Sequence, residues 1–396
     1  MSAVASATER RYLNDTFAEL CRIASPSGSE RACAELVGRE LRSLCLDVRE
    51  DDAGPRAGSD CGNLLARIPA RPRLIGEPAR GDTAPPGVLL CAHLDTVPPR
   101  APLEPVLVDD GWENANDGIL GADNKAAIAV ILALARRLHG EGSPVDVELL
   151  FTVCEERGLA GARAFDASSL RSDFGYVFDH ASPIGEVVLS SPSHFRVEAS
   201  FHGAAAHAGI RPEDGRSAIL AAARSIAGMS LGRVDEHTTV NVGTIAGGSA
   251  MNVVPEHCTL VAEVRGHSDE QAEAALTELI DCVYESANLP ECECDVDIDT
   301  QRTCAAYSTL RSAPAVRAAE HALRACGYEP TPVQSGGASD ANALIAQGFT
   351  AVNLANGTER NHEPSERVSV AALEGMLDVA LALPDSVVAH SSHADR

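Results

Sequence analysis

Several features that mark other classes of protein are scarce or missing in this chain of 396 residues. Positive charge is scarce, because 32 Lys and Arg residues stand against 57 Asp and Glu residues, for a net charge of -25. Binding to nucleic acid or to an anionic membrane surface requires a basic surface, so the charge argues against both partners. No run of about 18 apolar residues occurs, which argues against a transmembrane helix. Internal repeats and low-complexity tracts are also absent.

The chain also lacks the signals of secretion. Residues 1–16 have no apolar core of the kind a signal peptide requires. The 12 cysteines are scattered without CxxC spacing, and Cys292 and Cys294 are only two positions apart. This distribution favours small buried thiols in a reducing compartment over a disulfide framework or a zinc knuckle. We therefore expect a cytoplasmic protein.

The chain is long enough for two domains, and its hydrophobic pattern changes twice. Up to about residue 191, apolar runs typical of buried strands alternate with segments of helical periodicity. Strands are predicted at 63–68, 87–93, 147–154 and 176–178, and helices at 8–23, 29–45, 124–139 and 158–165. Residues 69–86 and 112–119 are expected to be loops that flank the functional site.

A different pattern follows, in which apolar and polar residues alternate as in strands with one solvated face. It predicts strands at 194–201, 259–264 and 291–299 and helices at 217–229 and 269–286. The first pattern then returns, with helices at 310–325, 339–346 and 370–382 and a strand at 351–354. The predicted fold is α/β, a mixed and largely parallel sheet flanked by helices. Residues 1–191 and 304–396 form this discontinuous domain, and residues 192–303 form an inserted α+β domain.

Residues able to bind a metal stand near the ends of the predicted strands. His93 ends an apolar strand, and Asp95 lies two residues further on, so both point to the same side of an extended chain. A carboxylate in that position can support an imidazole that binds metal through its other nitrogen. The other candidates are Asp123, Glu155, Glu156, Asp179 and His362. Because strand ends meet at one edge of an open α/β sheet, we expect these side chains to converge.

This set of residues suits hydrolysis at two metal ions. Two zinc-like ions about 3.5–4 Å apart need about five protein ligands, one of them a bridging carboxylate. A further base must accept the proton of the attacking water and deliver it to the leaving amine. Adjacent carboxylates suit this division, since Glu155 and Glu156 face different ways after the apolar run 149–154. The sequence therefore predicts a two-metal hydrolase.

Motifs along nearly the whole chain resemble those of the M20 metallopeptidases, and most closely the peptidase T-like branch. In order, they are CAHLDTVPP, LGADNKAAIAV, FTVCEERGLAGA, the segment ending in FDH, AAHAG, GGSAMNVVPEHCTLVAEVR, SGGASDAN and NLANGTERNHEPSERV. The resemblance implies a zinc exopeptidase-like catalytic domain. It also implies that the inserted domain is a lid that forms a homodimer.

The resemblance assigns a role to each matching residue. His93 and His362 would each bind one metal, Asp123 would bridge both, and Glu156 and Asp179 would complete the two sites. Glu155 would be the general base, and Asp95 would orient His93. The cofactors implied are two divalent ions per chain, with Zn²⁺ favoured and Co²⁺ or Mn²⁺ as alternatives.

Three further residues, in the inserted domain, match positions that contact substrate in relatives. His207 of the AAHAG motif would reach an active site across the dimer and stabilise the oxyanion. Asn252 and Arg265 would hold a substrate carboxylate, which an arginine can bind with two hydrogen bonds. Arg265 could equally form a surface ion pair.

The preferred function is an aminopeptidase of the tripeptidase type that hydrolyses short peptides. An N-acyl amino acid deacylase or a carboxypeptidase of the same fold stays open, because the chemistry at the metals is identical. A non-catalytic binding protein is the remote alternative, since such a protein would normally have lost the base or a ligand.

Overall fold

The computed structural model describes residues 4–71 and 87–391, which form two compact units. Unit 1 comprises residues 1–189, 308–335 and 339–396, and unit 2 comprises residues 190–307 and 336–338. The predicted inserted domain, 192–303, lies within unit 2. Most of the predicted loop at 69–86 lies outside the described residues.

Unit 1 is built on a mixed sheet with the strand order β1-β2-β6-β3-β7-β16-β8-β14, and β15 also pairs with β8. Its four central strands, β6, β3, β7 and β16, are parallel, whereas β1, β2 and β8 pair antiparallel with their neighbours. The strands are β1 (Val48–Glu50), β2 (Leu64–Ile68), β3 (Gly87–His93), β6 (Asp146–Thr152), β7 (Phe174–His180), β8 (Glu186–Ser191), β14 (Tyr307–Ser308), β15 (Thr331–Gln334) and β16 (Ala351–Ala355). The predicted fold class is confirmed, although parallel pairing is limited to the centre of the sheet.

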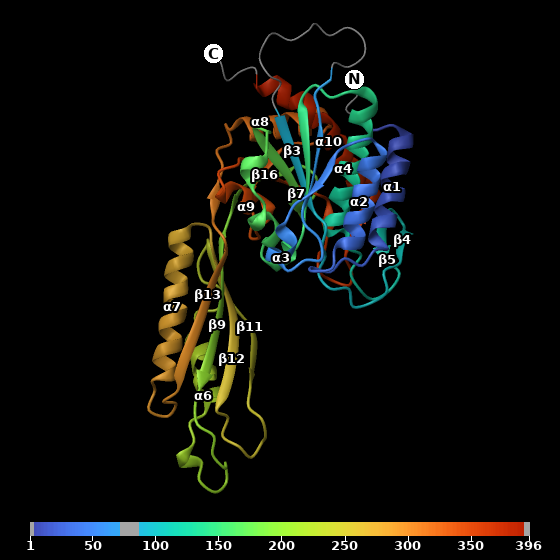
Figure 1. The fold of residues 1–396 in the computed structure, drawn as a ribbon. Helices are drawn as coiled ribbons and strands as arrows, with labels where there is room; N and C mark the ends of the chain where they lie inside the picture. The colour runs from blue at the N-terminus through green and yellow to red at the C-terminus, as the bar shows by residue number, and fades with distance from the viewer. Residues whose placement is uncertain (1–3, 72–86, 392–396) are drawn as a thin grey trace. The chain divides into compact units, whose positions relative to one another are not determined.

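Helices cover both faces of this sheet. Helix α4 (Ala122–Glu141) is rich in Ala, Ile and Leu and almost wholly buried, and it packs on β3 and β7. Figure 1 shows α4, α1 and α2 on one side of β3 and β7, and α9 on the other. The remaining helices of unit 1 are α1 (Ala7–Cys21), α2 (Arg31–Ser43), α3 (Ala53–Ala57), α5 (Ala160–Ala164), α8 (Pro314–Ala325), α9 (Asp340–Ala346) and α10 (Val370–Ser391), with 3₁₀ turns at Glu155–Arg157 and Ala167–Ser169.

A small second sheet corrects one prediction for unit 1. Strands β4 (Pro105–Val108), β5 (Gly111–Asn114), β17 (Thr358–Glu359) and β18 (Arg367–Ser369) pair in the order β17-β18-β5-β4. Trp112 lies opposite Val368, so the first part of the predicted loop at 112–119 is a strand. The pairing joins residues that are far apart in sequence, and periodicity within one segment carries no signal of such pairing.

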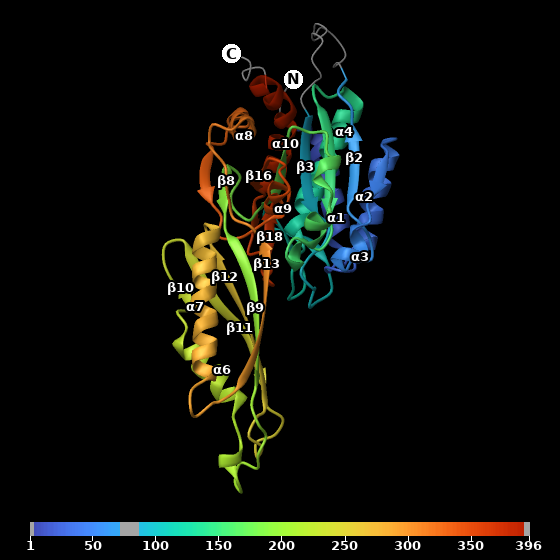
Figure 2. The same ribbon diagram turned by 60° about the vertical axis from the view of Figure 1, so that its left-hand side comes forward.

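Unit 2 is a five-stranded antiparallel sheet in the order β10-β11-β12-β9-β13. Helices α6 (Ala218–Gly228) and α7 (Asp269–Ala287) lie along one side of the sheet in Figure 2 and pack on β9 and β12. The strands are β9 (Ser193–His202), β10 (Gly232–Arg233), β11 (Thr238–Gly247), β12 (His257–Gly266) and β13 (Asp295–Cys304), and a 3₁₀ turn spans Pro212–Asp214. Residues 193–202 alternate strictly between buried and half-buried, as the sequence pattern predicted.

The sequence analysis of unit 2 differs from the structure in two respects. Strands β10 and β11 were not predicted, and the strand predicted at 291–299 begins only at Asp295. The alternation of Cys292 and Cys294 imitates a strand, but the backbone turns there: the N–H groups of Cys292 and Glu293 both donate to Leu289 O. Both cysteines are buried and belong to the apolar core of unit 2.

Two chemical features of the described residues bear on function. No helix is long and apolar enough to cross a membrane. All twelve cysteines carry free thiols.

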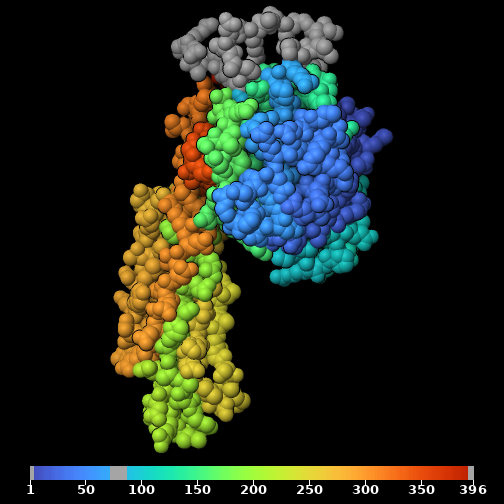
Figure 3. Space-filling view, viewed as in Figure 1, coloured from blue at the N-terminus to red at the C-terminus, as the bar shows by residue number. Residues whose placement is uncertain are grey.

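Residues from the first part of the chain, blue in Figure 3, cover much of the face of unit 1 seen in that view. The N-terminal segment is therefore an integral part of this unit.

Candidate metal centre

The residues predicted to bind metal converge at one edge of the unit 1 sheet. His93 is the last residue of β3, and Asp179 is the next-to-last residue of β7. Glu155 and Glu156 begin the 3₁₀ turn that follows β6 after a gap of two residues. Since β3, β6 and β7 are parallel neighbours, their carboxyl ends bring these side chains together.

Asp123 lies between the two histidines. One of its carboxylate oxygens, Oδ1, is 3.1 Å from His93 Nε2, and the other, Oδ2, is 3.4 Å from His362 Nε2. His93 Nε2 also lies 3.6 Å from Asp179 Oδ1, and His362 Nε2 lies 2.8 Å from Glu156 Oε1. The arrangement therefore divides into a half around His93 and a half around His362, and Asp123 is common to both.

Two overlapping groups of ligand atoms are close enough to share an ion. His93, Asp123 and Glu156 offer atoms within 4.8 Å of one another, and so do His93, Glu155 and Asp179. The presence of Glu155 in the second group places the carboxyl group of the predicted base within 4.8 Å of His93 and Asp179. Imidazole and carboxylate donors in this mixture suit zinc or manganese.

The many charged groups of the cluster also favour the binding of metal ions. Burial and the nearby carboxylate of Asp179 raise the pKa of Glu155 well above its usual value. Burial and the charge of Asp123 raise the pKa of Asp179 to about 7. Hydrogen bonds to Asp123 and Glu156 raise the pKa of His362 to about 10. So many buried carboxylates repel one another, and bound cations would relieve that repulsion, so the donor set fits divalent metal ions.

Asp95 supports the site in two ways. Its backbone carbonyl oxygen lies 3.0 Å from His93 Nδ1 and its Oδ1 lies 3.3 Å from the same nitrogen, which leaves Nε2 facing Asp123. Its carboxylate also accepts hydrogen bonds from the backbone N–H groups of Glu155 and Glu156, at 3.0 and 3.2 Å. The sequence suggested the contact with His93 but gave no sign of the bonds to the Glu pair.

Two residues near His362 that sequence reasoning missed hold Asp123. Glu366 is buried, and its carboxylate accepts hydrogen bonds from the backbone N–H groups of Leu120, Gly121 and Asp123, at 2.8, 2.8 and 2.9 Å. Asn361 Nδ2 donates to Asp123 Oδ2 at 2.9 Å. Both residues belong to the NHEPSERV motif, where their nearness to His362 was the only available signal.

A further buried carboxylate, Asp340, was also missed. It lies at the start of α9, accepts a hydrogen bond from the Thr152 hydroxyl, and is almost completely shielded from solvent. Burial raises its pKa to about 6, although the bond from Thr152 opposes the shift. Asp340 stands in the SGGASDAN segment, which the sequence marked only as a matching motif.

The candidates in unit 2 occupy exposed loops or strand ends. The loops of His207 and Asn252 adjoin, because Ala208 N–H donates to Asn252 O at 3.0 Å, and both side chains are exposed. Arg265 donates to both carboxylate oxygens of Glu263, at 3.3 and 3.0 Å. In this structure it therefore forms an ion pair, which was the alternative to substrate binding. The roles in substrate binding stay predictions.

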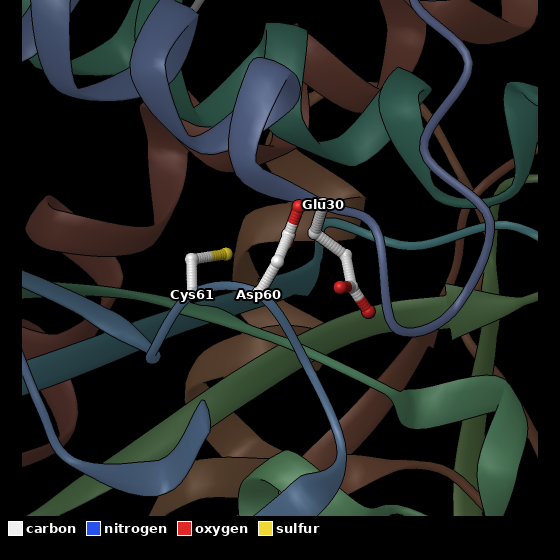
Figure 4. Close-up of side chains that lie close together, drawn as sticks. All are labelled: Glu30, Asp60 and Cys61. Carbon is white, nitrogen blue, oxygen red and sulfur yellow. The ribbon is translucent and has the colours of Figure 1, made fainter. Parts of the chain in front are cut away.

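One more group of potential ligands, Glu30, Asp60 and Cys61, lies apart from this centre. Figure 4 shows the Asp60 carboxylate beside the start of α2 and the Glu30 carboxylate turned away from it. Asp60 Oδ1 accepts the N–H of Arg31 at 2.9 Å, and Glu30 accepts bonds from Ser59 Oγ and Cys154 N–H. Because these oxygens are engaged in hydrogen bonds, we assign no metal to this group.

The chain is similar to known proteins over nearly its full length. A model of peptidase family M20/M25/M40 matches residues 89–385. The protein YqjE of Bacillus subtilis (strain 168) is 32% identical over 379 residues, which cover 95% of this chain and 98% of YqjE. Aminopeptidase PepT from Bacillus cereus ATCC 10987 is similar in structure, with a TM-score of 0.82, 31% identity, and coverage of 96% of this chain and 98% of PepT.

A tripeptidase from Staphylococcus aureus subsp. aureus Mu50 gives a TM-score of 0.86 at 29% identity, with 96% of this chain and 99% of the tripeptidase covered. The family match spans every residue of the converging cluster from His93 to His362. The fold, the cluster and the matches agree, and the chain therefore belongs to peptidase family M20/M25/M40 and is a metal-dependent hydrolase.

Proposed function

We propose that this protein is a di-metal aminopeptidase of the tripeptidase type that acts on short peptides. The observation that carries the proposal is the position of Asp123, whose two oxygens face His93 and His362 separately. A carboxylate in this position can bridge two ions. The likeness to PepT and to the tripeptidase supports the choice of aminopeptidase.

The proposed ligands divide between the two halves of the cluster. His93 and Asp179 would hold one ion, Glu156 and His362 the other, and Asp123 both. Two divalent ions, with Zn²⁺ favoured and Co²⁺ or Mn²⁺ as alternatives, would polarise the scissile carbonyl and make a water molecule more acidic. The donor chemistry of the cluster supports this assignment.

Glu155 would act as the general base. Its carboxyl lies beside His93 and Asp179 but makes no hydrogen bond or ion pair within the described residues, so it is available to a water molecule or substrate. A raised pKa suits the role, since a base whose pKa lies nearer to the working pH can both accept a proton and return it to the leaving amine. Asp95 would orient His93.

Unit 2 would be the lid and the dimerisation domain. His207 would donate a hydrogen bond to the oxyanion of the partner's site, and Asn252 with Arg265 would hold the substrate carboxylate. The exposure of the His207 and Asn252 loops supports contact with another molecule. Arg265 would have to exchange its bonds with Glu263 for bonds to substrate. The twelve free thiols support a cytoplasmic location.

Metal analysis followed by a substrate screen tests the proposal. Protein purified without chelator and then loaded with Zn²⁺ should hold about two equivalents per chain, and one equivalent or none in active protein would contradict it. The screen compares tripeptides, dipeptides and N-acyl amino acids. Release of the N-terminal residue from tripeptides is the expected result. Preferred hydrolysis of N-acyl amino acids, or of the C-terminal residue of a peptide, would favour a deacylase or a carboxypeptidase instead.

A further inference from the structure

Three successive backbone N–H groups in the loop after β6 point at two buried carboxylates. Those of Glu155 and Glu156 donate to Asp95, as described above, and that of Cys154 donates to Glu30 Oε1 at 3.1 Å. The residue that starts this series, Cys154, has a φ of 51°. A residue with a side chain adopts this left-handed conformation only at a cost, so its surroundings must hold it there.

Glu30 is well placed to hold Cys154. Its side chain is fully buried, and Oε1 accepts bonds from Gly28 N–H at 2.9 Å and from the Cys154 thiol at 3.3 Å as well as from Cys154 N–H. Oε2 accepts a bond from Ser59 Oγ at 2.6 Å. The carboxylate thus joins three segments that are distant in sequence. Figure 4 shows it turned away from the Asp60 carboxylate.

The same N-terminal segment also reaches the second carboxylate. Ser27 Oγ donates to Asp95 Oδ2 at 2.7 Å, and Ser25 and Ser27 exchange backbone hydrogen bonds with Thr96. Residues 25–30 therefore support the loop of the Glu pair in two ways. Glu30 binds Cys154, the residue before the pair, and Ser27 binds Asp95, which accepts the N–H groups of the pair. None of these residues offers an atom to the groups of potential ligands at the metal centre.

We propose that Glu30 is a positioning residue for the reaction. It fixes the backbone of Cys154 and thereby aims the side chains of Glu155 and Glu156, which diverge from the next two positions. The proposal rests on the proposed function for the roles of Glu155 as base and Glu156 as ligand. The hydrogen bonds that carry the proposal do not depend on those roles.

The geometry distinguishes two substitutions of similar size. In Glu30→Gln, Oε1 still accepts from Gly28 and Cys154, while Nε2 donates to Ser59 Oγ. In Glu30→Met, only a thioether, which is a weak acceptor, is left. Loss of contacts of this supporting kind typically costs about 10–100-fold in activity or metal affinity. We therefore expect kcat within about 3-fold of the wild type for Glu30→Gln, and a kcat about 10–100-fold lower for Glu30→Met with KM little changed.

Glu148→Met is the matched control. Glu148 is equally buried, and its carboxylate also accepts two backbone N–H groups, those of Arg171 and Ser172, at 2.8 Å each. It lies near the start of β6, away from the Glu pair. Its loss should lower the melting temperature as the loss of Glu30 does, but kcat per folded molecule should stay within about 3-fold of the wild type.

Hydrogen exchange of the metal-free protein gives a readout that does not depend on catalysis. Exchange of peptides spanning 152–158 should be faster in Glu30→Met than in the wild type, unchanged in Glu30→Gln, and unchanged in Glu148→Met. Zn²⁺ titration should show about 10–100-fold weaker binding of one ion in Glu30→Met, because Glu156 serves one ion only. Unchanged exchange together with unchanged kcat in folded Glu30→Met would overturn the proposal.

A second comparison covers the case in which Glu30→Met does not fold. Adding Ser59→Ala to Glu30→Gln removes the partner that fixes the amide, so exchange in 152–158 should rise and kcat should fall. Ser59→Ala alone should have a smaller effect, because either carboxylate oxygen can still accept from Cys154. Equal effects of Ser59→Ala in both backgrounds would contradict the proposal. If Glu30→Met changed exchange while Glu155→Gln kept full activity, the assignment of the base would fail and the positioning of the loop would stand.

Discussion

Replacing Glu155 by Gln separates proton transfer from metal binding and folding. Gln has the same shape as Glu but cannot accept and return a proton at neutral pH. The Glu155 backbone N–H would still donate to Asp95, so the loop should keep its course. We expect turnover of a tripeptide to be lost while the protein keeps about two metal ions per chain.

The size of the loss follows from the role of the carboxyl group. General acid–base catalysis contributes about 10²- to 10⁴-fold to kcat, or about 3–5 kcal/mol of transition-state stabilisation. Glu155 makes no side-chain hydrogen bond within the described residues that an amide would break, so this loss should fall on kcat alone. Steady-state kinetics of the metal-loaded variant measure it directly.

The same substitution should not destabilise the metal-free protein. Burial, with help from Asp179, raises the folded-state pKa of Glu155 above its ordinary value of 4.5. A carboxyl whose pKa is raised by folding costs stability once the pH exceeds the pKa of the unfolded chain. Glu155→Gln removes that cost, so its melting temperature should equal or exceed that of the wild type at pH 7. The difference should disappear near pH 4.

The reasoning would be refuted by near-normal kcat in Glu155→Gln, which would remove Glu155 as the base. Loss of metal together with activity would also contradict the reasoning, since Glu155 would then be a metal ligand. The test is needed because Glu155 lies close to His93 and Asp179. Glu156→Gln is the comparison, because the neighbouring carboxyl faces His362 and should be needed for metal retention.

Three further outcomes are expected. Glu156→Gln should lower the affinity for one metal ion about 10–100-fold and reduce kcat as well, as metal titration and kinetics would show. Mixing His207→Ala with Glu155→Gln under subunit exchange should restore part of the activity if His207 acts in trans, because one site of each heterodimer is then complete; no recovery in demonstrated heterodimers would mean that it does not. Glu9→Gln should lower the melting temperature at pH 7 but not near pH 2. The hydrogen bond from Arg137 lowers the pKa of Glu9 from 4.5 to about 2. The stabilisation by Glu9 is therefore fully present above pH 4.5 and is lost as the pH falls towards 2.

Elements whose burial pattern lies within one segment of the chain could be predicted from the sequence. The continuous apolar segments that became β3 and β6 could be identified as central strands, since a strand buried on both faces needs apolar residues at every position. The small sheet could not be identified in this way. Its strands exist because Trp112 and Val368 pair across more than half of the chain, and neither segment carries that pairing in its own pattern.

The candidate site shows the same division. His93, Glu156 and Asp179 could be proposed because each stands near the end of an apolar strand, and parallel strands bring their ends together. Glu366 and Glu30 could not be proposed. In sequence they look like any exposed glutamate, since the loop N–H groups that they accept, such as those of Leu120 and Cys154, belong to residues far away in the chain.

These hidden carboxylates have a common physical task. A loop that carries a metal ligand cannot satisfy its own backbone N–H groups as a helix or strand does, and burying those groups unpaired is costly. Glu366 accepts the N–H groups of the loop that carries Asp123, while Glu30 and Asp95 accept those of the loop that carries Glu156. These two loops are therefore fixed by buried carboxylates that are not themselves predicted metal ligands. Because these bonds join protein groups only, they would hold the predicted ligands Asp123 and Glu156 in place, and little conformational entropy would be lost on metal binding.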